Sequence, residues 1–195
     1  MNCAQPDSRI WLSHTDDAKR KYPYTWQLVE TDPGELACIH SALANNVVKE
    51  AVLEGKIAEL DGYDRVQSEV RYGEEKSRID LLLSDAQEQC YVEIKCVTLH
   101  MGDGLGLFPD AVSARGSKHL RELALMKQQG HRAVLLFCVQ NTAIDRVGVA
   151  AAIDVKYAQT LQDVITAGVE VLVYSTVIAP EGIALKERLP FIEIG

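Results

Sequence analysis

The residues best suited to chemistry lie in two neighbouring segments that alternate between apolar and charged positions. If these segments form a hairpin that turns in the polar run 84–89, Asp80 lies opposite Glu93. In the same register Arg78 lies opposite Lys95. The two-residue period of a strand places these four side chains on one face, with apolar residues on the other. Two facing carboxylates repel one another unless a cation lies beside them, so the spacing predicts a divalent metal site.

Mg²⁺ (or Mn²⁺) suits this arrangement because it prefers oxygen ligands, takes one or two carboxylates and keeps water and substrate phosphate in its other positions. Such an ion stabilises negative charge on a phosphate and makes a bound water more acidic. Lys95 could orient that water or help to deprotonate it. This is the logic of phosphodiester hydrolysis, with Asp80, Glu93 and Lys95 as catalytic residues. A DNA-binding protein that keeps the acidic cluster without catalysis stays open beside a Mg²⁺-dependent nuclease.

An ordinary solvated hairpin surface explains the same pattern. The two basic residues could pair diagonally with the two carboxylates, and exposed ion pairs of this kind are weak and common. An Asp followed at a distance by Glu-x-Lys is not a specific motif. Spacing alone therefore leaves both the metal site and the solvated charge cluster open.

A second group of charged residues lies around the start of a predicted helix. Lys118 and His119 begin this helix, and its free N–H groups could hold a phosphate while Lys118 and the preceding Arg115 add positive charge. The alternative is a polar first turn that binds nothing. His119 is also a candidate general base. Asp110, after Phe108-Pro109, is either a third acidic ligand or a residue that shapes the turn.

The elements that must position these residues follow from hydrophobic periodicity and turn signals. The first three strands of the main segment predict an antiparallel meander, and the later strand-helix-strand units predict parallel pairing. The fold class expected is α/β, a mixed sheet with flanking helices. The predicted strands are 65–72, 78–83, 90–97, 133–139 and 169–177, and the predicted helices are 41–59, capped by Ser41 and closed by Asp61-Gly62, 117–129 and 154–167.

Two short strands, 9–13 and 25–30, precede the turn signal Asp32-Pro33-Gly34, which predicts a domain boundary between residues 33 and 34. The loop between these strands carries the basic run Lys19-Arg20-Lys21 beside Tyr22, Tyr24 and Trp26, a mixture that could contact a phosphate backbone and stack bases. Such a run is also common on solvated surfaces.

Composition limits the kinds of partner. A formal charge of −8 over 195 residues argues against DNA binding by a uniformly basic surface, so any such contact must use a local basic patch. The longest apolar runs are strand-sized and no leader opens the chain, so we expect a cytoplasmic protein without membrane segments. Five cysteines without a CxxC pair are expected to be reduced core residues.

Six local strings resemble those of the sugar fermentation stimulation protein family, and they occur along the chain in the family's order. The resemblance covers nearly the whole chain, although His40-Ser41 stands where the family tends to have Asn-Thr. The strings with the most chemistry are Ser77-Arg78-Ile79-Asp80, Val92-Glu93-Ile94-Lys95, Phe108-Pro109-Asp110 and Arg115-Gly116-Ser117-Lys118-His119.

The resemblance implies a PD-(D/E)XK nuclease-like core with Asp80, Glu93 and Lys95 at the signature positions and Glu50 or Glu69 as an additional acidic residue. It also implies sequence-nonspecific DNA binding, a role in regulating sugar (maltose) metabolism, and an N-terminal OB-fold of which only a remnant, residues 1–33, is expected here. A homodimer is a further expectation. The DNA-contacting residues expected are Lys19, Arg20, Lys21, Arg78, Arg115, Lys118 and His119.

Overall fold

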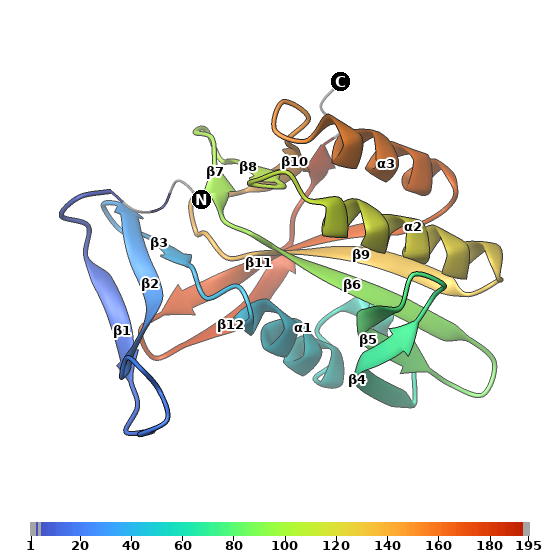
Figure 1. Ribbon diagram of the computed structural model, residues 1–195, viewed down its shortest axis with the longest axis horizontal. Helices are drawn as coiled ribbons and strands as arrows, with labels where there is room; N and C mark the ends of the chain where they lie inside the picture. The colour runs from blue at the N-terminus through green and yellow to red at the C-terminus, as the bar shows by residue number, and fades with distance from the viewer. Residues whose placement is uncertain (1–2, 4, 193–195) are drawn as a thin grey trace.

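A six-stranded mixed sheet forms the centre of the protein in a computed structural model that describes residue 3 and residues 5–192 (Figure 1). Three neighbouring strands form the expected antiparallel meander, and the next two add in parallel, as predicted. The order across the sheet is β12 (Gly182–Arg188), β11 (Glu170–Ala179), β9 (Arg132–Val139), β6 (Gln89–Val97), β5 (Ser77–Ser84) and β4 (Arg65–Tyr72).

Helices cover both faces of this sheet, which confirms the expected α/β class. Helix α1 (Leu43–Leu53) packs on one face, and α2 (Ala114–Gln128) and α3 (Val155–Thr166) pack on the other (Figure 1). Strand β9 is therefore almost wholly apolar and buried, as central strands covered on both sides are. The face expected to carry the charge cluster is covered as well, by α2 and α3, and is not an open surface.

Two smaller sheets lie beside the main one. The N-terminal sheet contains the two predicted strands and one more across the turn at Gly34, whose φ of +87° suits glycine. Its last strand contacts the main domain, where the Cys38 N–H donates to the Gln140 carbonyl at 2.9 Å. The N-terminal strands are β1 (Ile10–His14), β2 (Tyr24–Asp32) and β3 (Glu35–Cys38), and the other sheet has the order β13 (Phe191–Ile192), β10 (Arg146–Val149), β8 (Leu105–Phe108) and β7 (Leu99–His100).

Helix boundaries differ from the predicted ones at both ends of α1. The helix begins after Ala42, which occupies the N-cap position, and not after the predicted cap Ser41. It ends at Leu53 because Gly55 takes a left-handed φ of +66° and the Lys56 N–H donates back to the Ala51 carbonyl. The remainder of the predicted helix contains only the short 3₁₀ turn η1 (Ala58–Leu60).

Helix α2 begins earlier than predicted, because the Ser113 hydroxyl caps it by accepting from the Gly116 N–H at 2.9 Å. Lys118 and His119 therefore lie in the second turn and not at the free N-terminus. The predicted cap of α3 is confirmed, since an Asp154 carboxylate oxygen accepts from the Tyr157 N–H at 2.9 Å.

The five cysteines are free thiols, and four of them are buried, which confirms their place in the core. Among the described residues, no helix combines the length and the apolar character that crossing a bilayer would require.

Candidate functional site

Asp80 lies where strands β5 and β6 part. Their ladder runs from Ser84 opposite Gln89, as predicted, to Leu81 opposite Val92. Beyond it, the Ile94 N–H donates to Asp80 Oδ2 at 2.7 Å, so a side chain takes the place of a strand partner. The second oxygen, Oδ1, accepts from Asn45 Nδ2 at 2.8 Å, which connects the carboxylate to α1.

Strand β5 loses its alternation at Asp80. Ile79 packs in the core under α2 and α3, whereas Leu81 packs in the core under α1, although two-residue spacing should place them on one face. The prediction that the apolar residues of this strand all lie on one face is therefore wrong at Asp80. Opposite this point in β4, Glu69 has a φ of +55°, which is unusual for a side chain with a Cβ. The local irregularity turns the Asp80 carboxylate into the gap between the strands.

Glu93 is the most enclosed acidic residue of the site, with 1% of its surface exposed. One oxygen, Oε1, accepts from both Lys95 Nζ and His119 Nδ1. The other, Oε2, is buried and has no hydrogen-bond partner among the residues that the structure describes. A buried carboxylate oxygen without a donor is costly unless another group reaches it. The solvated-surface alternative is therefore wrong for this residue.

The pKa values of the Asp80 and Glu93 carboxylates are shifted in opposite directions. Burial and the nearby negative charge of Glu93 raise the pKa of Asp80 to about 6, even though the Ile94 N–H favours its charged form. Burial also acts to raise the pKa of Glu93, but the His119 hydrogen bond and the charge of Lys95 outweigh it and lower that pKa. Near neutral pH the site therefore holds an ionised Glu93 beside an Asp80 that burial makes ready to accept a proton.

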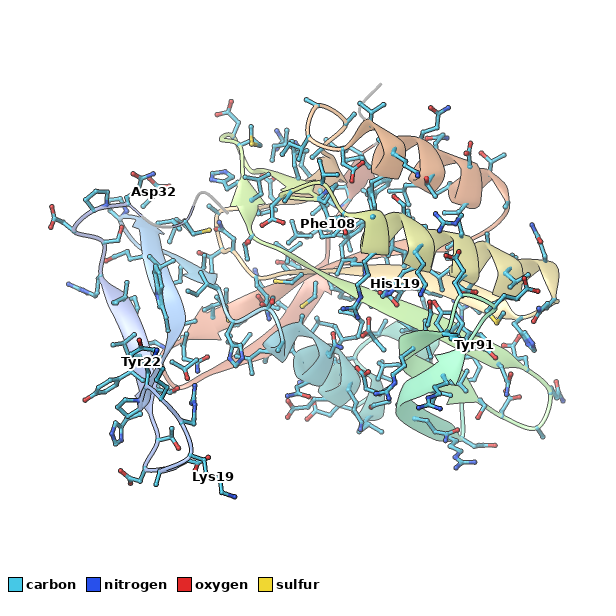
Figure 2. All side chains as sticks on the ribbon, in the orientation of Figure 1. Lys19, Tyr22, Asp32, Tyr91, Phe108 and His119 are labelled. Carbon is cyan, nitrogen blue, oxygen red and sulfur yellow. The ribbon has the colours of Figure 1, made fainter. Side chains whose placement is uncertain are left out.

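His119 connects this pair to the start of α2. Its Nε2 accepts from Arg115 Nε at 3.3 Å, so the proton of a neutral imidazole is assigned to Nδ1, where it is donated to Glu93. Lys95 Nζ lies 3.4 Å from the same Nδ1. Figure 2 shows His119 pointing from α2 toward the sheet. Helix α2 thus contributes to the site through its side chains and not through its N-terminus.

A second buried carboxylate, Glu122, holds the β4–β5 turn one helical turn further along α2. Its two oxygens accept from the Glu74 N–H at 3.0 Å and the Glu75 N–H at 2.6 Å. Lys118 Nζ donates to the Glu75 carbonyl, so this lysine is bound to the same turn. The turn leads directly into β5, and Glu122 therefore fixes the strand that carries Asp80.

Replacing Gly73 by alanine should destabilise the protein by about 2–4 kcal/mol, because a Cβ there would lie 1.8 Å from Glu122 Oε2 and φ is +70°. Urea unfolding measures the loss. Gly34→Ala is the matched control, since Gly34 has a φ of +87° but no atom within 4 Å of a built Cβ. It should lose only about 1 kcal/mol, and equal losses in both variants would contradict the importance of the Glu122 contact.

Of the other predicted site residues, Glu50 and Lys19 lie apart from this cluster. Glu50 is exposed and lines a groove between α1, β2 and β12, while Asn45 is the α1 residue that reaches Asp80. Lys19 lies at the far end of the β1–β2 hairpin, well separated from His119 in Figure 2. In that hairpin Lys21 Nζ sits 5.3 Å from the centre of the Tyr22 ring. Asp110 is exposed in the loop before α2.

Asn45 and Glu122 were missed by the sequence reasoning. Glu122 occupies a position in α2 where helical spacing predicts an apolar residue, between Leu120 and Leu123, and this mismatch was the available signal. Asn45 offered no such signal, because a polar residue near a helix start is ordinary.

Sequence models of known families match both parts of the chain. The model described as the sugar fermentation stimulation protein RE domain matches residues 42–182, and the SfsA N-terminal OB domain matches residues 1–39. The chain belongs to the sugar fermentation stimulation protein family. The family resemblance and the nuclease-like α/β fold expected from it are thus confirmed. The domain boundary after residue 33 remains a prediction.

Relatives within the sugar fermentation stimulation protein family are similar over almost the whole chain. The homolog from Thioalkalivibrio sulfidiphilus is 51% identical, over 97% of this chain and 79% of that protein. The homolog from Shewanella sp. strain MR-4 is 52% identical, over 97% and 81%. The solved structure of Pyrococcus furiosus SfsA in complex with Ca²⁺ superposes with a TM-score of 0.83 and 26% identity, covering 94% of this chain and 77% of that one.

Proposed function

We propose that this protein binds DNA without sequence preference and hydrolyses its phosphodiester bonds with a divalent cation. The observation that carries the proposal is the convergence of Asp80, Glu93 and Lys95 from two strands at the point where those strands part. The family's RE-domain match and the Ca²⁺ complex of the archaeal relative support it.

The residues present fit a divalent cation. Glu93 Oε2 is buried without a partner, and each Asp80 oxygen accepts one hydrogen bond while an ionised oxygen can accept two. Neither at this site nor elsewhere in the described part of the chain do three His, Cys, Asp or Glu side chains come together as a complete set of metal ligands. Two carboxylates are what Mg²⁺ commonly takes from a protein when it keeps water and phosphate in its remaining positions, so we propose Mg²⁺ or Mn²⁺ at Asp80 and Glu93.

The bound cation would neutralise charge on the reacting phosphate and make a nearby water more acidic. The chain's own residues supply the rest. Lys95 is oriented by Glu93 and lies within reach of His119, so it can hold a water for attack. His119 in turn keeps Glu93 ionised by donating to it, and Arg115 fixes the tautomer of His119. Asn45 and the Ile94 N–H orient the Asp80 carboxylate.

DNA would meet the protein through local positive charge, because the formal charge of the chain is −8. We propose Arg115 and Arg78 as contacts near the reacting phosphate and the Lys19-Arg20-Lys21 loop as a separate contact on the N-terminal hairpin. Lys118, whose ammonium already binds the Glu75 carbonyl, is proposed to add charge without gripping a phosphate directly. A role in regulating sugar metabolism remains a prediction from the resemblance. Cytoplasmic location remains a prediction from the apolar runs of the sequence, and dimer formation remains a separate prediction.

Cation binding should depend on pH through Asp80. Its raised pKa means that the folded protein holds this proton between about pH 4 and pH 6, so ionising the group costs stability as pH rises through that window. A cation must displace the proton below about pH 6, and its affinity should fall about tenfold per pH unit there and level off above about pH 7. Calorimetric titration of Mg²⁺ and Mn²⁺ across this pH range measures the cation affinity. An affinity that stays constant below pH 6 would contradict the assignment of Asp80 as a cation ligand.

A further inference from the structure

The tip of the β4–β5 hairpin carries an unusual concentration of positive charge. Arg71 and Arg78 lie directly opposite one another in the ladder between the two strands. Like charges in directly opposed positions destabilise a sheet. Within the described residues neither arginine, nor the neighbouring Lys76, takes part in an ion pair. The fold therefore maintains an unfavourable pair without a negative partner of its own.

These cations surround a hollow of about 690 Å³. Ser77 and Tyr72 also line the hollow, but they are buried, with 3% and 8% of their surface exposed. Because successive strand residues point to opposite faces, their side chains lie on the face opposite the two arginines, where Tyr72 packs in the core under α2. The charged groups around the hollow are therefore the three cations Arg71, Lys76 and Arg78.

The turn that closes the hollow is held in a fixed shape. Glu122 binds its N–H groups, and Lys76 adopts a left-handed φ of +57°, which side chains with a Cβ rarely take. The negative charge of Glu75 in the turn is neutralised by Arg121, whose Nη2 donates to both carboxylate oxygens at 3.0 Å. Glu122 therefore holds the turn, and with it the two arginines that flank it, in one arrangement.

We propose that this hollow binds a phosphate group of the nucleic acid, next to the phosphate that faces Asp80. Arginine forms forked hydrogen bonds that match phosphate oxygens, and the Lys76 ammonium adds a point charge. Arg78 precedes Asp80 by two residues in β5, about 6.6 Å along the strand, so one DNA strand can contact both. This site would fix the register of the strand in the proposed nuclease, and the inference therefore rests on the proposed function.

Arg71→Gln tests the site, with Arg65→Gln as the matched control, because Arg65 is an exposed arginine at the opposite end of the same strand. Binding to a fluorescent duplex is measured by anisotropy in EDTA at several NaCl concentrations. Arg71→Gln should weaken binding about tenfold and lower the slope of log affinity against log salt by about 0.9, the value of one phosphate contact. Arg65→Gln should leave both nearly unchanged, and equal effects of the two variants would overturn the inference.

Calorimetric titration with inorganic phosphate separates this inference from the proposed function. The parent should bind phosphate, and Arg71→Gln should not. Binding of phosphate without any binding of DNA would remove the proposed function and leave a site for a small phosphorylated molecule. Oligonucleotides with and without a 5′-phosphate separate the remaining sources: equal affinity supports a phosphate within the strand, and affinity only for the phosphorylated end overturns that placement.

Discussion

Asp80→Asn should abolish metal-dependent cleavage of supercoiled DNA, with a loss of at least about 10³-fold in rate. The variant keeps the size of the side chain and one acceptor oxygen, but it removes the charge that would hold the cation beside Glu93. A Lewis-acid cation contributes several kcal/mol to charge stabilisation on a phosphate, and each 1.36 kcal/mol corresponds to about tenfold in rate. Conversion of supercoiled to nicked and linear DNA with Mg²⁺ or Mn²⁺ measures the effect.

Asp163→Asn is the matched control, since Asp163 is an exposed carboxylate on α3. This variant should cleave DNA as fast as the parent. Chelation by EDTA should stop the parent as completely as the substitution does. DNA affinity in EDTA should not fall in Asp80→Asn, because removing a negative charge near a phosphate does not weaken attraction. A variant that cleaves as fast as the parent would contradict the site assignment.

The same experiment separates the nuclease from a DNA-binding protein that keeps the fold without the reaction. Such a protein would retain DNA in a salt-dependent manner, yield no nicked product in the parent, and respond to neither metal nor Asp80→Asn. If the parent yields no nicked product, calorimetric titration of Mg²⁺ into the parent and Glu93→Gln shows what the carboxylates do. Cation binding that is lost in the variant would mean that the cation assists DNA binding. No cation binding in the parent would mean that the two carboxylates have a structural role.

Phe137→Ala should lower the free energy of unfolding by about 3–5 kcal/mol, the largest stability effect we expect from a single substitution. The ring is fully buried in β9 beneath α2 and α3. It lies 5.5 Å from the Phe108 ring and stacks on Phe191 at 5.9 Å. Its removal leaves a cavity where the small β7–β8–β10–β13 sheet meets the main sheet. Urea unfolding followed by circular dichroism measures the change.

Val177→Ala is the control for this substitution, because Val177 is 51% exposed on the adjacent strand β11. It should change stability by less than about 0.5 kcal/mol. Because Lys95 lies opposite Phe137 in the parallel β6–β9 ladder, Phe137→Ala should also reduce cleavage at temperatures where it is still folded. A loss of stability no greater than that of Val177→Ala would mean that the core collapses around the cavity at little cost.

The sequence by itself determined the main strands and their pairing. The apolar alternation and the polar run 84–89 fixed the β5–β6 register, because a slip of one residue would turn the buried side chains to the other face. Turn and cap signals marked α2 and α3 to within about three residues, but α1 ends at Leu53, well before the predicted residue 59. Ser113, a cap before the predicted start of α2, was passed over. Six matching strings were enough to indicate the family, which the family models confirm.

Only the tertiary structure decided the environment of the site. Alternation within a hairpin specifies two faces, but it cannot reveal that α2 covers the charged one, and this burial separates an enclosed Glu93 from a solvated ion pair. The break in alternation at Asp80 and the contacts from Asn45 and Glu122 depend on residues distant in the chain. Desolvation and charge proximity shift the two carboxylate pKa values apart, and both are properties of packing that residue types and local spacing do not contain.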